Sequence, residues 1–437
     1  MSLYEKIGDG VTFHYLQTSK FTTDYFSVHF VMPLAAETAS GYCLLARLLK
    51  RGCREYPSQA ALYSRLEELY DAAMGISSFR QGEKQVLSMG MDVLASRFIF
   101  DGSPVTDEAL ALLRAVLMDP YLENGVFSSA YVEREKESLK DDIRASINDK
   151  NSYALMRCRQ LMCAGEPYAV NTSGTLESVD ACTPESLYAL YLRMLKEATV
   201  EIFYIGTDAY ELARIRAEAF SRALGARTPK TADTVFCAPR PEVQRVTETV
   251  SAVQGKLAMG FRTGITEKTS VKEKVALSLF NMIYGLSPVS KLFMNVREKR
   301  SLCYYCASRN DNIKGTLFVY SGIENQNAAV AEEEILLQLD AIKKGEITEQ
   351  EMLCAKEGFR DTTRSVADSP FTLEQWYLTR ALYGDALTPE EMFAILNELT
   401  VEDVVAVASH ITLDTVFFLE GSVGKGEADG ESSCGIL

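Results

Sequence analysis

The sequence predicts an α+β fold built from two tandem halves. Short segments in which apolar residues alternate are followed by longer segments with the periodicity of amphipathic helices, and this order occurs twice. Thr183 and Thr400 each begin a predicted helix that precedes an apolar strand, and these starts lie about half of the 437-residue chain apart. A duplication explains this correspondence better than a coincidence of two common capping patterns.

In the first half, alternation predicts strands near residues 11–15 and 26–32, a strand pair at 75–80 and 84–91, and a strand at 199–205. Helical periodicity covers residues 41–51, a segment after the N-cap Ser58, a segment from the cap Thr106 to residue 118, and residues 129–163. The helix after Thr183 has a proline in its first turn, at Pro184.

The second half repeats this order after a proline-containing stretch without periodicity. Strands are expected at residues 256–261, 302–308, 316–322 and 415–419, and helices at 271–284 and from about 327, 348, 371, 388 and 400. We therefore predict a first half at residues 1–225, a linker at 226–245, a second half at 246–420 and a flexible tail at 421–437.

Composition excludes several classes of function. The chain has 45 Lys and Arg residues against 60 Asp and Glu residues, so its net charge of −15 disfavours nucleic acid and anionic membranes as partners. The N-terminus lacks a signal-peptide pattern, and the longest apolar stretch, residues 109–118, contains Arg114 and is too short to span a membrane. These features predict a cytoplasmic protein with reduced cysteines.

Cysteine and histidine give little sign of a metal site. Cys303 and Cys306 have C-x-x-C spacing, but an isolated pair inside a predicted strand is more typical of core packing than of a redox or zinc role. The three histidines, His14, His29 and His410, are far apart in the sequence. No two of them can form the i, i+4 pair that binds zinc on a helix.

Three segments resemble the insulinase/pitrilysin family of zinc peptidases, the M16 family, in its half-length, processing-protease-like form. They are Gly165-Glu166-Pro167-Tyr168 followed by Gly174-Thr175-Leu176-Glu177-Ser178, then Tyr204-Ile205-Gly206-Thr207-Asp208, and Arg297-Glu298-Lys299-Arg300-Ser301-Leu302-Cys303-Tyr304. The resemblance spans nearly the whole chain. It implies that each half is an antiparallel sheet packed with helices on one face, the LuxS/MPP-like metallohydrolase type.

The resemblance also shows what this chain lacks. Active members carry H-x-x-E-H, in which two histidines bind zinc and the glutamate acts as general base, while a later glutamate completes the metal site. At these positions the sequence has Cys43, Ala46 and Arg47, and Asp142 takes the place of the later ligand. Alanine cannot act as a base, and arginine puts a permanent cation at the metal position. We expect no zinc cofactor, and an ion pair from Arg47 to Asp142 or to Glu135.

Two features implied by the resemblance do not need a metal. Arg297 and Tyr304 match the arginine and tyrosine that reach the substrate carbonyl in the family, although capping and sheet packing explain them equally well. The family also adds peptide to a sheet edge in its metal-bearing half. Here that edge corresponds to five residues, Gly75, Ile76, Ser77, Ser78 and Phe79.

These implications favour a non-catalytic homologue that binds peptide or unfolded polypeptide and pairs, as a heterodimer, with an intact H-x-x-E-H paralogue. A homodimer is the alternative partnership. Among metal-less members the chain is similar to the bacterial YmfF-like proteins, which are named for an association with the modification of elongation factor P. Two other functions stay open: a peptide-binding scaffold without a catalytic partner, and a zinc peptidase rewired around Cys43 and Asp142.

Overall fold

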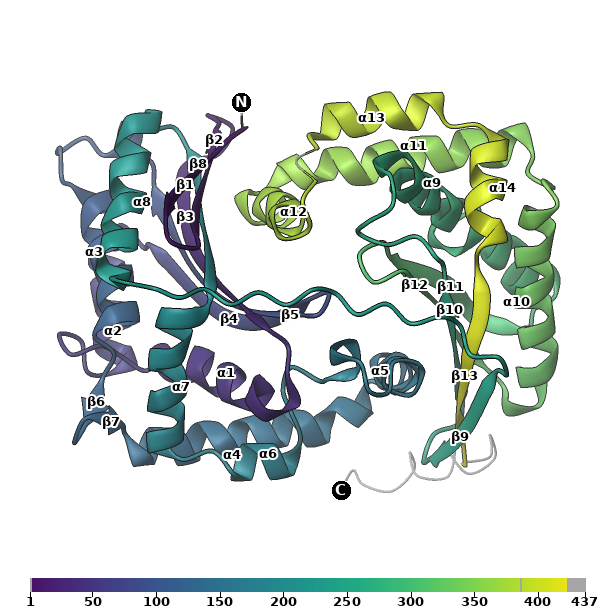
Figure 1. Ribbon diagram of the computed structural model, residues 1–437, viewed down its shortest axis with the longest axis horizontal. Helices are drawn as coiled ribbons and strands as arrows, with labels where there is room; N and C mark the ends of the chain where they lie inside the picture. The colour runs from purple at the N-terminus through teal and green to yellow at the C-terminus, as the bar shows by residue number, and fades with distance from the viewer. Residues whose placement is uncertain (1, 386, 423–437) are drawn as a thin grey trace, which may run out of the picture. The chain divides into compact units, whose positions relative to one another are not determined.

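The computed structural model describes residues 2–385 and 387–422, and it forms two compact units (Figure 1). Of the described residues, unit 1 comprises 2–144, 170–233 and 368–378, and unit 2 comprises 145–169, 234–367, 379–385 and 387–422. The predicted boundaries at residues 225 and 246 stay a prediction. From residue 423 onward, the predicted tail lies outside the described residues.

Unit 1 contains a six-stranded sheet in the order β1-β2-β8-β3-β5-β4. Neighbouring strands are antiparallel, except that β2 and β8 are parallel. β4 lies at one edge of the sheet and β1 at the other. The strands are β1 Ser2–Gly8, β2 Val11–Gln17, β3 Thr23–Pro33, β4 Ala73–Gln81, β5 Lys84–Leu94 and β8 Thr199–Gly206, and a separate hairpin pairs β6 Leu122–Glu123 with β7 Val126–Phe127.

Helices cover one face of this sheet and bury its apolar side chains (Figure 1). Phe26, Val28 and Phe30 of β3 point into that core, as their alternation predicts. On the opposite face, His29 Nε2 lies 2.9 Å from Glu374 Oε1, at the start of α12 (Pro370–Tyr383). The unit 1 helices are α1 Ala36–Leu49, α2 Gln59–Glu68, α3 Val105–Met118, α4 Ser129–Ala145, α6 Leu176–Asp180, α7 Pro184–Glu197 and α8 Tyr210–Leu224.

Unit 2 has a five-stranded sheet in the order β11-β12-β10-β13-β9, again with one parallel pair, β13 and β9. Helix α5 (Lys150–Met162) packs on β10 and β13, where its Cys158 joins a small core with Ala258 and Phe417. The strands are β9 Gln244–Val250, β10 Gly255–Arg262, β11 Cys303–Asp311, β12 Thr316–Ile323 and β13 Thr412–Gly421.

The remaining helices of unit 2 follow the order that the sequence predicts. They are α9 Val271–Asn281, α10 Ala328–Lys343, α11 Glu349–Ser365, α13 Pro389–Glu398 and α14 Val401–Ser409, with π-helical segments at Met282–Leu286 and Leu292–Lys299. The first π-helical segment meets β11 at Gly285. A larger residue would clash there, because an added Cβ would stand 2.8 Å from the Ser308 backbone nitrogen. Short 3₁₀ turns occur at Ser96–Phe98, Ser146–Asn148, Pro167–Ala169, Asn325–Asn327 and Val366–Asp368.

The predicted fold class is confirmed, and so is the repeated order of elements. Thr183 and Thr400 both form capping boxes before helices that lead into an inner strand of each sheet. The prediction that Thr106 caps a helix was wrong, because α3 begins at Val105 and Thr106 is buried within its first turn. Strands β1 and β9 and helix α8 were not predicted. Among the helices formed by the described residues, none has both the length and the apolar composition of a membrane span.

A buried ionic cluster stabilises unit 2. Glu166, which follows α5, accepts hydrogen bonds from Arg262 Nη2 at 2.6 Å and pairs with Lys314 Nζ at 2.5 Å. Burial alone would raise the pKa of the Glu166 carboxyl, but hydrogen bonds from the two cations hold it below its ordinary value. Because all three side chains are buried, the carboxylate compensates two cations that have little access to water.

We expect Glu166→Gln to lower the free energy of unfolding by about 3 kcal/mol at neutral pH, since it removes one negative charge from a buried cluster in which Asp414 is the other carboxylate near Arg262. The pKa of Glu166 is depressed in the folded state, so its contribution is present above the unfolded pKa and disappears as pH falls through the folded value. Denaturant unfolding at neutral and acidic pH measures both effects. The exposed Glu242→Gln is the matched control; an equal loss in both variants contradicts the argument.

Candidate functional site

The candidate site in unit 1 is a cavity of about 360 Å³ between α1, α4 and β4, which we call the Arg47 cavity. It brings together residues that the sequence presents in three separate segments. Its lining consists of Cys43, Ala46, Arg47, Lys50, Arg51, Gln59, Ile76, Ser77, Ser78 and Glu135. The positions expected from the degenerate zinc motif therefore face the strand expected to bind peptide.

The Arg47 guanidinium occupies the contact between α1 and α4. Its Nη2 donates to Asp142 Oδ2 at 2.5 Å, its Nη1 donates to Ser138 Oγ at 3.1 Å, and Nη1 lies 4.0 Å from Glu135 Oε2. The predicted ion pair is therefore confirmed, with Asp142 as the close partner. Glu135 is bound by Arg51, whose Nε donates to Oε1 at 2.5 Å.

The electrostatics of the cavity keep Arg47 charged and Cys43 neutral. Burial alone would lower the pKa of Arg47, but its hydrogen bond to Asp142 raises the pKa above its ordinary value. Burial raises the pKa of the Cys43 thiol, and this effect outweighs the opposing influence of Arg47. Zinc binds the thiolate, so a zinc ion here would have to displace the Cys43 proton.

These residues do not fit a zinc ion. Asp142 and Glu135 are each held by a guanidinium, Cys43 is kept protonated, and Ala46 has no group that accepts a proton. Among residues 2–385 and 387–422, no group of three or more His, Cys, Asp or Glu side chains is arranged to hold a metal ion. Three cations line the cavity, and because Arg47 and Arg51 are paired with Asp142 and Glu135, Lys50 is the lining cation left to attract an anion.

Strand β4 forms the open side of the Arg47 cavity. It pairs with β5 along one edge and is the last strand of its sheet. Ile76, Ser77 and Ser78 line the cavity, whereas Gly75 is exposed, with no atom within 4 Å of an added Cβ. Phe79 is half-buried further along the strand. The five predicted residues thus belong to an edge strand that can accept another strand.

The second predicted feature lies in unit 2. Arg297 and Tyr304 line a cavity of about 390 Å³, which we call the Arg297 cavity, together with Glu298, Ser301, Leu302, Cys303, Glu324 and Asn327. Arg297 comes from the π-helical segment Leu292–Lys299 and Tyr304 from the start of β11, as the predicted passage from helix to strand requires. Their side chains are accessible, since the Arg297 side chain is 41% exposed and Tyr304 is 61% exposed.

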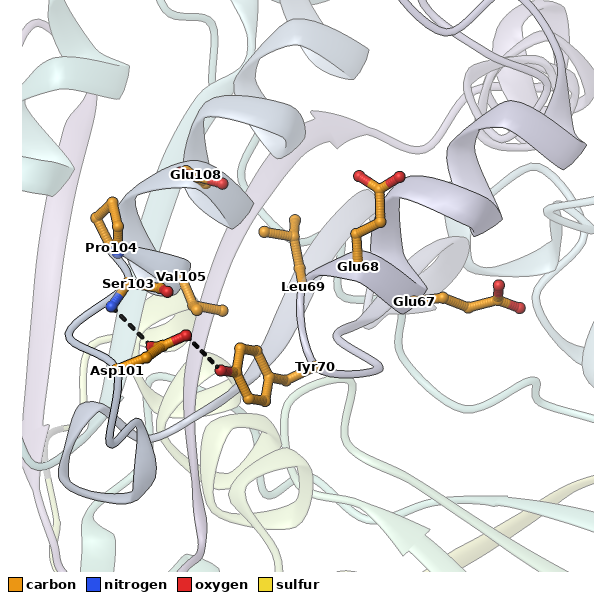
Figure 2. Close-up of a pocket in the computed structure, with 9 residues that line it drawn as sticks. All are labelled: Glu67, Glu68, Leu69, Tyr70, Asp101, Ser103, Pro104, Val105 and Glu108. Carbon is orange, nitrogen blue, oxygen red and sulfur yellow. Dashed lines mark hydrogen bonds between the residues drawn. The ribbon is translucent and has the colours of Figure 1, made fainter.

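A third hollow, on unit 1, was not predicted (Figure 2). It lies between the end of α2 and the start of α3, and its lining includes Glu67, Glu68, Asp101 and Glu108. The Tyr70 hydroxyl donates to Asp101 Oδ2 at 3.0 Å, as Figure 2 shows. The hollow is acidic, and we assign no chemistry to it.

Sequence reasoning missed Lys50, Arg51, Ser138 and Gln59, which complete the Arg47 cavity or hold its charges. Arg51 had a detectable signal, because it lies four residues after Arg47 and so one turn further along the same side of the helix end. Gln59 had none, since its position depends on the turn between α1 and α2; its Oε1 accepts a hydrogen bond from Arg51.

Fold and site together define a protein with the architecture of a zinc peptidase and an arginine in place of the metal. Residues 181–359 match the family model of the peptidase M16 inactive domain. The chain is 32% identical to the probable inactive metalloprotease YmfF of Bacillus subtilis, over 95% of this chain and 97% of that protein. It therefore belongs to the M16 peptidase family, among its inactive homologues.

Solved structures agree with this assignment. A conserved protein from Enterococcus faecalis superimposes with a TM-score of 0.89 at 30% identity, over 96% of this chain and 99% of that chain. The peptidase M16 inactive domain from Pseudomonas fluorescens superimposes with a TM-score of 0.80 at 20% identity, over 97% and 99% of the two chains, and shows the same fold.

We expect that removing the guanidinium and restoring ligands creates a zinc site. In the triple variant Cys43→His, Arg47→His, Asp142→Glu, two histidines lie one helical turn apart, facing a carboxylate on α4, so it should bind about one zinc per chain. The purified wild type should bind almost none. Elemental analysis after dialysis measures both, with the double variant Cys43→His, Asp142→Glu, which keeps the cation, as control. Stoichiometric zinc in the wild type contradicts our interpretation of the cavity.

Proposed function

We propose that this chain is the substrate-binding subunit of a two-chain peptidase, in which an intact H-x-x-E-H paralogue carries the zinc and cleaves the peptide bond. The observation that carries the proposal is the Arg297 cavity. There, Arg297 and Tyr304 are accessible to a ligand, while the hydrolytic groups at the Arg47 cavity are replaced. A chain with one half of a catalytic apparatus is useful where a partner supplies the other half.

The chemistry of this proposal assigns a role to each of the two side chains. The Arg297 guanidinium stacks over Phe293, at 4.7 Å from the ring centroid, and its ion-pair contact with Glu298 is 3.6 Å long. These contacts orient the cation and leave it available to a carbonyl oxygen that gains negative charge during hydrolysis. The Tyr304 hydroxyl is a second donor in the same cavity.

The Arg47 cavity contributes peptide binding. An extended peptide that adds to β4 forms backbone hydrogen bonds with the free edge, and those bonds are indifferent to the missing metal. At Ser77 and Ser78 the peptide meets a cavity lined by Arg47, Lys50 and Arg51. We infer that the preferred peptide places an acidic side chain or its terminal carboxylate there. We place this activity in the cytoplasm.

The paired assembly is tested with a quenched peptide library, this chain and the intact-motif paralogue from the same organism. Cleavage in the mixture should exceed that of either chain alone. Arg297→Ala in this chain should reduce kcat of the mixture by about 100-fold, the usual loss when one donor to a developing oxyanion is removed. Lys299→Ala, which removes an exposed cation beside the Arg297 cavity but outside its lining, should leave kcat unchanged.

Two results would overturn the pairing. Equal activity of the paralogue with and without this chain leaves a peptide-binding scaffold or a homodimer as the function, and size-exclusion chromatography with light scattering distinguishes those. Cleavage by this chain alone, abolished by a chelator, establishes instead a peptidase rewired around Cys43 and Asp142.

Peptide binding by this chain alone is measured by fluorescence anisotropy with matched acidic and basic peptides. The acidic peptide should bind more tightly, and added salt should weaken its binding. Lys50→Glu should raise its Kd by about 10-fold, because it reverses one charge of the Arg47 cavity. Lys6→Glu, the same change on β1 at the opposite edge of the sheet, is the control. Equal effects of the two variants place the peptide elsewhere.

A further inference from the structure

We propose that Cys303 and Cys306 form a two-thiol site that reduces hydroperoxides and closes to a disulfide. The inference is independent of the paired peptidase, because it concerns the thiols of this chain alone. It begins with a geometric difference between the sequence pattern and the structure. In a regular strand, residues three apart point to opposite faces, so C-x-x-C spacing keeps the two thiols apart.

A β-bulge at Tyr304 changes that geometry. Cys303 pairs with Ile323 of β12, whereas Tyr305 pairs with Gly322 and Cys306 with Ser321. Tyr304 is therefore the extra residue. Because Ile323 and Ser321 are two apart on β12, they share a face, and the two cysteines opposite them share it too. The same bulge leaves Tyr304 exposed at the Arg297 cavity.

The two thiols are therefore neighbours on one face of the sheet. Ser321, which stands opposite Cys306, donates its hydroxyl to the Tyr305 carbonyl oxygen at 2.8 Å. Cys303 lines the Arg297 cavity and is half-buried, whereas Cys306 is only 4% exposed. One thiol is thus reachable from the cavity, and the second lies behind it, which is the arrangement of an attacking and a resolving cysteine.

Electrostatics favour Cys303 as the attacking group. The neighbouring Cys306 thiol lowers the pKa of Cys303 to about 7, against the effect of burial, and Ser321 and the Arg297 charge act in the same direction. The pKa of Cys306 is raised well above its ordinary value, chiefly by the neighbouring Cys303 and by burial. Burial also raises the pKa values of Cys43 and Cys237. Cys303 is therefore the most acidic of these four thiols.

The reaction balances with a hydroperoxide as the oxidant. The Cys303 thiolate attacks the terminal peroxide oxygen, the O–O bond breaks, and the leaving alkoxide or hydroxide takes up a proton. The resulting sulfenic acid is then attacked by the Cys306 sulfur. An S–S bond forms, the S–O bond breaks, and the hydroxyl leaves as water with the Cys306 proton. Two thiols supply the two electrons, and one alcohol (or water) and one further water are the products.

The test treats the reduced full chain with limiting hydrogen peroxide and locates the oxidised cysteines by peptide mass mapping. The tryptic peptide of residues 301–309 contains both thiols, so the disulfide appears there as the loss of two hydrogen atoms. We expect this product in the wild type. Cys306→Ser should stop at a sulfenic acid on Cys303 that a dimedone probe captures. Cys303→Ser should give neither product.

Two comparisons make the test decisive. Cys237, exposed in unit 2, is the matched reference, since accessibility alone predicts that it oxidises first. Arg297→Ala should slow oxidation by about 3-fold near pH 7 and leave the rate unchanged well above the thiol pKa, because the Arg297 charge stabilises the thiolate. A general loss of structure would instead slow oxidation at both pH values. Preferential oxidation of Cys237, or capture of Cys303 by dimedone in the wild type without disulfide, would overturn the proposal.

Discussion

The ion pairs between α1 and α4 determine what the candidate site of unit 1 can do. The pair of Arg51 and Glu135 contributes most to stability, because these side chains are only 19% and 6% exposed. Removing one partner would leave the other as an uncompensated buried charge. The Asp142 side chain is 63% exposed, so its pair with Arg47 contributes about 1 kcal/mol or less. Arg47 therefore matters less for stability than for charge: it fixes a cation where a metal-dependent relative needs open coordination sites.

The bulge at Tyr304 is the corresponding constraint in unit 2. One extra residue on β11 moves Tyr304 out to the Arg297 cavity and brings Cys303 and Cys306 to the same face. The π-helical segment before it ends at Lys299, and Ser301, two residues further on, has a positive φ of 50° and donates its backbone N–H to the Arg297 carbonyl oxygen. This hydrogen-bonded helix end fixes the position of Arg297 relative to the bulge. The candidate carbonyl-binding groups and the thiol pair thus depend on a single local irregularity of the backbone.

Most elements were predictable because their signals are local. Ser58, Thr183, Thr348 and Thr400 cap helices through contacts with residues only three positions away. β1 and β9 were missed because their sequences contain only three and two apolar residues, too few to show alternation. The Arg47–Asp142 pair followed from a resemblance that placed two helices together. That Cys303 and Cys306 share a face was not predicted, since a bulge depends on pairing with β12, and sequence spacing alone describes a regular strand.

The residues at the degenerate zinc motif are compatible with the fold for a physical reason. Ala46 is buried in the core of unit 1, and Cys43 packs against that core, so both are compatible with the packing of α1 on its sheet. The edge of β4 offers backbone groups to an added strand, and no side-chain substitution on α1 removes them. That edge and the accessible Arg297 and Tyr304 side chains do not depend on the groups that Ala46 and Arg47 replace. The proposed pairing rests on this separation: a scaffold needs only the strand edge, whereas Arg297 and Tyr304 gain a role when a partner chain brings a scissile bond to them.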